Sequence, residues 1–521
     1  MRRYISALIL LFTAAATAQQ NDPVAAARQY RRVHAAQILR DYADLLAIPN
    51  LASDAPNIRR NAERIRELLQ ARGVQTRLLE VPNAPPIVYG ELGPFGGQLP
   101  ATIIIYAHYD GQPVDPAQWS SAPWQPVFRD QPGNTISLDQ AVRDPEARIY
   151  ARSASDDKAP IEAILAALDA MKAAGQQPKV FFKFFFEGEE EAGSPHLPAA
   201  IDQYRDLLKG DAWLICDGPV HQTRKMQVYF GARGVTGVEM TTYGPIRPLH
   251  SGHYGNWAPN PSAMLVSLLA AMRDDNAHIR IPHFYDDVRP LTSAEREALA
   301  QIPDIDSELR NELQLGRSEM PAQKVTCPQS PSASTCVERP TLQDAIMQPA
   351  MNIRGLEAGH VGSKAQNAIM TEAYASLDFR LVPDERPERV QQLVEDFVRA
   401  QGYTIVRGTP DAATRTGNPK VIRMNWEPGY PAARSDMSSP IAQAVVAAIQ
   451  RASGSPIIKM PTLGGSVPMY LFTDVLKTPA IGVPIVNHDN NQHAANENLR
   501  LQNLWDGIDV FAAILSMDAK R

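Results

Sequence analysis

The chain has 521 residues, of which 44% are hydrophobic and 21% are charged, and its formal net charge is −6. Single hydrophobic cores stop growing at about 250–300 residues, so a chain of this length is expected to form two domains. The weakly acidic balance and the lack of a long basic run argue against nucleic acid as a partner.

Residues 1–18 have the layout of a secretory signal peptide. Arg2 and Arg3 precede an apolar run at 5–16, and Ala16 and Ala18 supply the small residues at −3 and −1 of a cleavage site. The run is shorter than the roughly 20 residues that span a membrane, and no later apolar run reaches that length. We therefore expect a periplasmic or secreted protein without a stable membrane span after signal cleavage. A retained amino-terminal anchor is the alternative.

Export would allow disulfide bonds. Cys327 and Cys336 are nine residues apart in a segment rich in Pro and Ser, and an oxidising compartment would permit them to pair. Cys216 ends an apolar segment and is expected to be a small buried hydrophobic residue.

Helical and strand-like segments alternate along the first 230 residues. They are predicted at 24–48 (helix), 57–73 (helix), 74–81 (strand), 101–107 (strand), 160–171 (helix), 181–186 (strand) and 212–216 (strand). The runs at 101–107, 181–186 and 212–216 are short and continuously apolar, which is typical of strands buried on both faces in a parallel sheet.

The character of the sequence changes beyond residue 234. Predicted elements there are a strand at 235–243, a helix at 260–272, a strand of period two at 375–381 and an amphipathic helix at 390–397. These indicate a smaller α+β domain. Residues 286–350 are polar and weakly periodic. A helix at 440–452, a strand at 480–486 and a final helix at 499–517 return to the first pattern.

Metal-competent side chains recur at the ends of the predicted strands and at the start of one helix. They are His108 and Asp110, Asp156 or Asp157, Glu189 to Glu191, Asp217, and His488 or His493. Open α/β sheets bind ligands beyond the carboxyl ends of their strands, so these side chains are expected to meet there. Without metal binding, these residues would have structural roles: a solvated acidic turn, a helix cap at the aspartate pair and a turn at Asp217.

Imidazole and carboxylate ligands suit zinc, and they also suit manganese or cobalt. The carboxylates outnumber the needs of one tetrahedral ion, which favours two ions sharing a bridging carboxylate. The expected chemistry is attack on a carbonyl by a metal-bridged hydroxide, with a free carboxylate as general base. The sequence contains neither a Gly-x-Ser-x-Gly elbow nor a P-loop.

Four of these segments resemble the site motifs of one enzyme family. The residues at 108–110, 155–158, 186–194 and 490–497 are similar to motifs of the co-catalytic metallopeptidases that include carnosine dipeptidases, aminoacylases and carboxypeptidase G. The Asp-Asp-Lys sequence and the Phe-Glu-Gly-x-Glu-Glu-x-Gly-Ser string most resemble the carnosinase branch.

The resemblance implies a role for each site residue and a cofactor of two Zn²⁺ per subunit, with Mn²⁺ or Co²⁺ as possible substitutes. The implied metal ligands are His108, Asp217, a bridging Asp156, Glu191 and His493. Glu190 would be the general base and later proton donor, and Asp110 would orient His108.

The resemblance also implies a fold and an assembly. An α/β catalytic domain, with a mixed, mostly parallel sheet and helices on both faces, would comprise 19–230 and 426–521. An inserted α+β domain at 231–425 would act as a lid and form a homodimer. His250 would reach a partner's active site to polarise the scissile carbonyl. Arg380 and Ser466 would grip a substrate carboxylate through a bidentate fork and a hydroxyl. The simpler alternatives are an ordinary exposed histidine at 250 and a surface salt bridge at Arg380.

The sequence thus predicts a zinc metallopeptidase that cleaves the amide bond of a dipeptide or small peptide with a free C-terminal carboxylate. An N-acyl-amino-acid deacylase on the same scaffold is the close alternative. A non-catalytic extracytoplasmic peptide-binding protein and a two-metal phosphoesterase are the alternatives from other classes.

Overall fold

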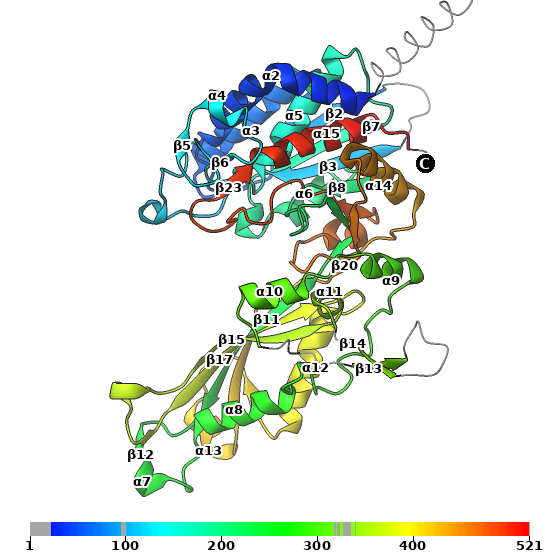
Figure 1. Ribbon diagram of the computed structural model, residues 1–521. Coiled ribbons are helices and arrows are strands. Elements are labelled where there is room, and N and C mark those ends of the chain that lie inside the picture. The colour runs from blue at the N-terminus through cyan, green and yellow to red at the C-terminus, as the bar shows by residue number, and fades with distance from the viewer. Residues whose placement is uncertain are drawn as a thin grey trace, which may run out of the picture. The chain divides into compact units, whose positions relative to one another are not determined.

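The computed structural model describes residues 22–94, 101–316, 319, 323–326, 335–338 and 340–519 (Figure 1). These residues form two compact units. Unit 1 contains the described residues up to Phe230, Ser435–Pro461 and the described residues from Leu471 onward; unit 2 contains those of Gly231–Arg434 together with Thr462–Tyr470.

Unit 1 is built on an eight-stranded mixed sheet. Its strands lie in the order β1 (Gln75–Leu79), β2 (Ile87–Leu92), β7 (Phe181–Glu187), β3 (Thr102–His108), β8 (Ala212–Ile215), β22 (Ala480–Gly482), β9 (Gln227–Tyr229), β21 (Ile458–Met460). β3 runs parallel to both of its neighbours, β7 and β8. Every residue of β3, β7 and β8 is buried, because both faces of these apolar strands are covered.

Helices pack on this sheet. They are α2 (Pro23–Leu46), α3 (Ala55–Gln70), α5 (Lys158–Ala173), α6 (Leu197–Gln203), α14 (Pro440–Ser453) and α15 (Leu501–Leu515). α5 is apolar and buried along almost its whole length, and it contacts α2, α15 and β3. A second, four-stranded sheet of unit 1 has the order β23 (Asn498–Arg500), β6 (Arg148–Tyr150), β4 (Val127–Arg129), β5 (Thr135–Ile136).

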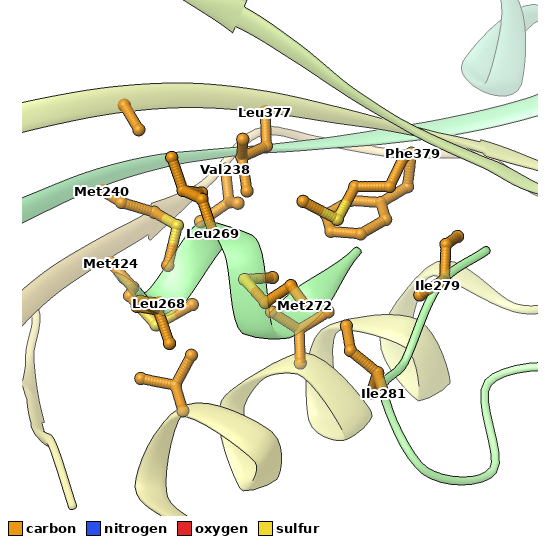
Figure 2. Close-up of a cluster of buried hydrophobic side chains, with 14 of the residues drawn as sticks. Val238, Met240, Leu268, Leu269, Met272, Ile279, Ile281, Leu377, Phe379 and Met424 are labelled. Carbon is orange, nitrogen blue, oxygen red and sulfur yellow. The ribbon is translucent and has the colours of Figure 1, made fainter. Parts of the chain in front are cut away.

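Unit 2 is an α+β unit around a five-stranded sheet. The order is β15 (Ala350–Glu357), β17 (Glu372–Leu381), β11 (Gly234–Tyr243), β19 (Val421–Trp426), β18 (Thr404–Val406). One face of the sheet packs on α8 (Pro261–Met272) and α12 (Pro387–Ala400) in an apolar core, part of which Figure 2 shows. Leu377 and Phe379 of β17 point into this core, as the period-two pattern predicted.

The remaining described elements are short. In unit 2 they include β10 (Gly231–Ala232), β12 (Leu249–His250), α7 (Ser251–Tyr254), α9 (Ser293–Ala300), α10 (Asp306–Glu312), β13 (Gln323–Thr326), β14 (Thr335–Glu338), α11 (Leu342–Ile346), β16 (Ala368–Ile369), α13 (Ala412–Gly417) and β20 (Ala433–Arg434). Among the described residues of the polar region 286–350 there are therefore three helices that the sequence pattern did not reveal.

The expected fold class, a mixed α/β unit with a smaller α+β unit inserted in its sequence, is confirmed. The chain returns to unit 1 at 434/435, later than the expected 425/426, because β20 pairs with β10 at the start of unit 2. Residues Thr462–Tyr470 also cluster with unit 2, since the amide of Leu463 donates to the carbonyl of Gly231.

The expected signal peptide and Cys327 lie outside the described residues, so cleavage and the Cys327–Cys336 disulfide stay predictions. Cys216 is a buried free thiol, as expected. Within the described part of the chain, no helix combines the length and apolarity that a membrane span requires.

Candidate metal centre

The site of unit 1 is formed where parallel strands end. β3 ends at His108, which is paired with Glu187 at the end of β7. β8, the other neighbour of β3, is followed closely by Asp217. Because the strands run parallel, these side chains share one edge of the sheet, where α/β folds bind their ligands.

Two groups of potential metal ligands lie at this edge. One consists of His108, Asp156 and Asp217, and the other of Asp156, Glu191 and His493. In each group, one ligand atom per residue lies within 4.8 Å of the others. Asp156 belongs to both groups, which is the arrangement expected of a carboxylate that bridges two ions.

The two oxygens of Asp156 face different histidines. Oδ1 lies 2.9 Å from Nε2 of His108, and Oδ2 lies 3.1 Å from Nε2 of His493. The same His493 nitrogen lies 3.2 Å from Oε2 of Glu191. His108 is fully buried, whereas the side chain of His493 is 54% exposed, so the second ligand group opens toward solvent.

Proton affinities in the site are strongly perturbed. Burial and the negative charge of Asp156 raise the pKa of Asp217 to about 6. Contacts with Asp156 and Glu191 raise the pKa of His493 to about 10. Burial opposes protonation of His108, but the carboxylates of Asp110 and Asp156 outweigh it and hold its pKa well above the ordinary value.

This electrostatic pattern fits a pair of divalent cations. Buried carboxylates that repel one another need a compensating positive charge, which protons on the histidines or bound metal ions can supply. The donor set of imidazole nitrogens and carboxylate oxygens is one that zinc accepts. Each group offers three protein ligands, and a catalytic zinc site keeps a further position for water or substrate.

The glutamates at the end of β7 and just after it have different partners. Glu191 belongs to a ligand group, whereas Glu189 accepts hydrogen bonds from the backbone amide and ring of His196. Glu187 accepts from the hydroxyls of Tyr106 and Ser194. Burial raises the pKa of Glu187 to about 7. Glu187 and Glu189 therefore have structural partners away from the ligand atoms.

Glu190 belongs to neither ligand group. Burial and the negative charges of Asp217 and Asp156 raise its pKa well above the ordinary value, against the positive charge of His108. Its backbone amide donates to Oδ1 of Asp110 at 3.1 Å. Glu190 is thus a carboxyl group beside the ligands that is free of the metal-ligand contacts.

Asp110 has more partners than the sequence indicated. Its Oδ1 lies 3.3 Å from Nδ1 of His108, the contact expected of an orienting residue. Its two oxygens also accept from the backbone amides of Glu190 and Glu191, at 3.1 and 3.0 Å. One buried carboxylate therefore accepts hydrogen bonds from the segment that carries Glu190 and lies beside a histidine of the first ligand group.

The choice between the two aspartates before α5 follows from their contacts. Asp156 is in both ligand groups, while Oδ2 of Asp157 accepts from the backbone amide of His108 at 3.3 Å. Burial raises the pKa of Asp157 well above its ordinary value. His488, the alternative to His493, is in neither ligand group.

The three expected substrate-binding residues are in unit 2. Arg380 donates to Oγ of Ser466 at 2.8 Å and to Asp378 at 3.1 Å, so the expected guanidinium–hydroxyl pair lies together. The contact with Asp378 is a salt bridge, which is the simpler alternative for Arg380. His250 is exposed, and its Nδ1 accepts from the amide of Gly252 at the start of α7.

Sequence reasoning missed residues that support the ligands. Gln112 donates to Oε2 of Glu191 at 2.8 Å, and Gln492 lies 3.4 Å from Oδ2 of Asp156. The carboxylate of Glu497 contacts the loop that carries Asp156. Gln112, Gln492 and Glu497 lie close in the sequence to His108 or His493, and this closeness was the available signal. It does not tell which way a side chain points.

A mixed α/β unit with two ligand groups sharing one aspartate at its sheet edge is characteristic of dinuclear metallohydrolases. The family follows from comparison: the model of peptidase family M20/M25/M40 matches residues 104–517, most of the chain. The chain therefore belongs to this family of metallopeptidases and is an enzyme.

Similar proteins include two named dipeptidases. The chain is 28% identical over 433 residues to the Cys-Gly metallodipeptidase dug1 of Schizosaccharomyces pombe, covering 82% of the chain and 81% of that protein. It is 24% identical over 440 residues to the Beta-Ala-His dipeptidase of Homo sapiens, covering 82% of the chain and 76% of that protein.

Solved structures agree on the fold. The M20 family metallo-carboxypeptidase Sso-CP2 from Sulfolobus solfataricus superimposes with a TM-score of 0.70 at 25% identity, over 92% of this chain and 98% of that one. Human carnosine dipeptidase 1 superimposes with a TM-score of 0.68 at 21% identity, over 95% and 98%, and shows the same fold.

Proposed function

We propose that the protein is a di-zinc dipeptidase that cleaves the amide bond of dipeptides with a free C-terminal carboxylate. The observation that carries the proposal is the sharing of Asp156 between the two ligand groups, with the unliganded carboxyl of Glu190 beside them. The similarity to a Cys-Gly metallodipeptidase and to a Beta-Ala-His dipeptidase supports dipeptides as the substrate class.

Each site residue has a role in this proposal. His108 and Asp217 would hold one ion, Glu191 and His493 would hold the other, and Asp156 would contribute a ligand to each. The bound ions would supply a polarised water and Lewis-acid activation of the scissile carbonyl. The charge of two bound cations would favour the ionised form of Glu190. Its carboxylate oxygen then takes a proton from the attacking water and passes it to the nitrogen of the leaving amine. Asp110 keeps the Glu190 segment and His108 in place.

Substrate recognition is assigned to unit 2. Arg380 and Ser466 bind the C-terminal carboxylate, because a guanidinium beside a hydroxyl offers several donors to one anion. The exposed His250 reaches the active site of a second subunit and polarises the scissile carbonyl. Unit 2 then serves as lid and dimer contact. A molar mass of two chains in light scattering would support this assembly, and a monomeric active enzyme would contradict it.

Residues 1–18 direct the protein to the periplasm or outside the cell in this proposal. The support is their order of arginines, apolar run and small residues. Mass spectrometry of the purified mature protein should find an amino terminus after Ala18. An intact terminus in a cytoplasmic fraction would contradict export.

A deacylase is the second candidate function. The chain is 30% identical over 177 residues to a succinyl-diaminopimelate desuccinylase of Acidovorax ebreus, a match that covers 33% of the chain and 40% of that protein. An amide next to a carboxylate-bearing group is common to dipeptides and N-acyl amino acids, so the metal site alone does not separate them.

A substrate screen tests the proposal. The zinc-loaded enzyme would be offered dipeptides, N-acyl amino acids and a phosphoester, with release of amino acid or phosphate as the readout. We expect kcat/KM to be highest for dipeptides. Preferential turnover of N-acyl amino acids would favour the deacylase, and calorimetric binding of a dipeptide without product would favour a binding protein.

A further inference from the structure

Glu497 is a buried carboxylate at the end of the His493 segment, and the proposed reaction assigns it no role. Its Oε1 accepts from the amide of Ser155, the hydroxyl of Ser155 and the amide of Asp156, each at 2.9 Å. Its Oε2 accepts from the amide of Ser153 at 2.9 Å and from Nη1 of Arg152 at 2.8 Å. Five donors thus converge on one side chain.

These contacts join two distant parts of the chain. Asp156 and Glu497 are 341 positions apart in the sequence, yet the amide of the first donates to the carboxylate of the second. The backbone supports the same junction, because the amide of Ala151 donates to the carbonyl of Glu497 and Asn498 pairs with Tyr150 between β23 and β6. The loop before α5 and the segment after β22 are therefore fixed against each other.

We propose that Glu497 is a positioning residue that holds the bridging carboxylate of Asp156 in register with His493. The inference rests on the proposed function, in which Asp156 and His493 are metal ligands. Glu497 contacts neither ligand's side chain, and it acts through the backbone that carries Asp156. Because Asp156 belongs to both ligand groups, a change at Glu497 affects both ions.

A carboxylate is required at this position for a chemical reason. An ionised carboxylate is an acceptor at both oxygens, whereas an amide replaces one oxygen with two N–H donors. In Glu497→Gln, either orientation of the amide turns an NH₂ group toward at least two of the existing donors. The loop must then shift, and the buried guanidinium of Arg152 loses its charged partner.

The test measures metal affinity, not only turnover. Zinc affinity of the full mature chain would be determined for both sites by competition with a chromogenic chelator, and the Co²⁺-loaded forms would be compared by visible absorption. We expect Glu497→Gln to bind both ions about 10- to 100-fold more weakly, as is typical when a partner of a metal ligand is removed. The Co²⁺ spectrum is also expected to change, because the geometry of Asp156 changes.

Two further variants separate positioning from general stability. Glu295→Gln removes a different buried glutamate that pairs with the buried Arg434, in unit 2, and it should bind both ions as the wild type does. Ser155→Ala removes only one donor to Glu497 and is expected to weaken metal binding by about 2- to 10-fold. This milder variant decides the question if Glu497→Gln fails to fold.

Unchanged affinity for both ions in folded Glu497→Gln, or in Ser155→Ala if the first does not fold, would overturn the proposal. Equal losses in Glu295→Gln would also overturn it, since they would show an effect of stability alone. A wild type that binds two ions but cleaves no dipeptide would refute the proposed substrate and leave this comparison valid. A wild type that binds fewer than two ions would refute both.

Discussion

At the scale of single residues, Asp156 joins a buried half of the site to an exposed half. His108 on one oxygen is shielded from solvent, while His493 on the other is half exposed. The second ligand group is therefore the one that is open to solvent, and the first lies in the protein interior. Glu190 is a further carboxyl group that belongs to neither ligand group.

The role proposed for Glu190 leads to the first prediction. Glu190→Gln should lower kcat for dipeptide hydrolysis by about 10²- to 10⁴-fold, the usual contribution of a general acid–base group. Both zinc ions should remain bound, because Glu190 is in neither ligand group. Steady-state kinetics and metal analysis of the same samples check this expectation.

Glu189→Gln is the matched control for that variant. Glu189 adjoins Glu190 in the chain, but its carboxylate contacts His196. Turnover in this control should stay within a few-fold of the wild type. Near-normal kcat in Glu190→Gln would contradict the assigned base.

A buried carboxyl in unit 2 gives a prediction on stability. Burial raises the pKa of Glu385 to about 7, although the amide of Val382 donates to it. Below the unfolded pKa of about 4.5 the carboxyl is protonated in both states and contributes nothing. As the pH rises toward 7, the unfolded chain ionises more readily, so stability falls by up to about 3 kcal/mol.

Glu385→Gln should therefore raise the free energy of unfolding at pH 8 and have much less effect at pH 4.5. Denaturation of both proteins at the two pH values checks the difference. An advantage that is equal at both pH values would show that ionisation of Glu385 is not its cause.

At the scale of elements, β3, β7 and β8 were predictable because their apolar runs are buried on both faces. β15 was not, since six of its eight residues are exposed and no alternating pattern marks this edge strand. β22 ends at Gly482, although Val483 to Val486 are also apolar and buried. Continuous apolar runs thus predicted the buried strands, but they did not predict the residue at which hydrogen bonding between strands ends.

The helices α9 and α11 were missed for a different reason. They are short, and neither has a long apolar stripe. Each begins with a capping box, formed by Thr292 with Glu295 and by Thr341 with Asp344. This local signal was present in the sequence and would have identified both helix starts.

Helix α8 provides a prediction at this scale. Leu268 is buried in the core of unit 2 (Figure 2), while Val266 on the same helix is 53% exposed. Leu268→Ala should lower the free energy of unfolding by about 2–5 kcal/mol, because it leaves a cavity. Val266→Ala should change it by less than about 0.5 kcal/mol. Urea denaturation of the two variants checks the contrast, and equal effects would contradict the packing described.

At the scale of the whole molecule, the sequence predicted the order of the parts better than their junctions. The start of the second unit at 231 was expected from the family resemblance, and the sequence pattern changes beyond residue 234. The chain returns to the first unit at 434/435, because β20 pairs with β10 in the second unit. Each of these strands contributes only two residues to the pairing, so the sequence shows no period-two pattern there. The contribution of Thr462–Tyr470 to unit 2 is likewise a long-range contact.

The residues of the metal site were also predicted only in part from the sequence. Strand ends and residue types indicated where ligands gather, but the alternatives Asp156 or Asp157 and Glu189 to Glu191 remained open without the family resemblance. Contacts across the fold separate them: Asp157 turns to the backbone of His108, and Glu189 turns to His196. Such contacts depend on the folded chain and not on local sequence.

In the proposed function, two bound metal ions make this chain a dipeptidase. The most direct test is dipeptide hydrolysis by the full mature protein after chelator treatment and again during stepwise return of Zn²⁺. We expect no hydrolysis without metal and recovery that is complete at two ions per chain. Undiminished hydrolysis by the verified metal-free protein, or full activity with a single ion, would contradict the account.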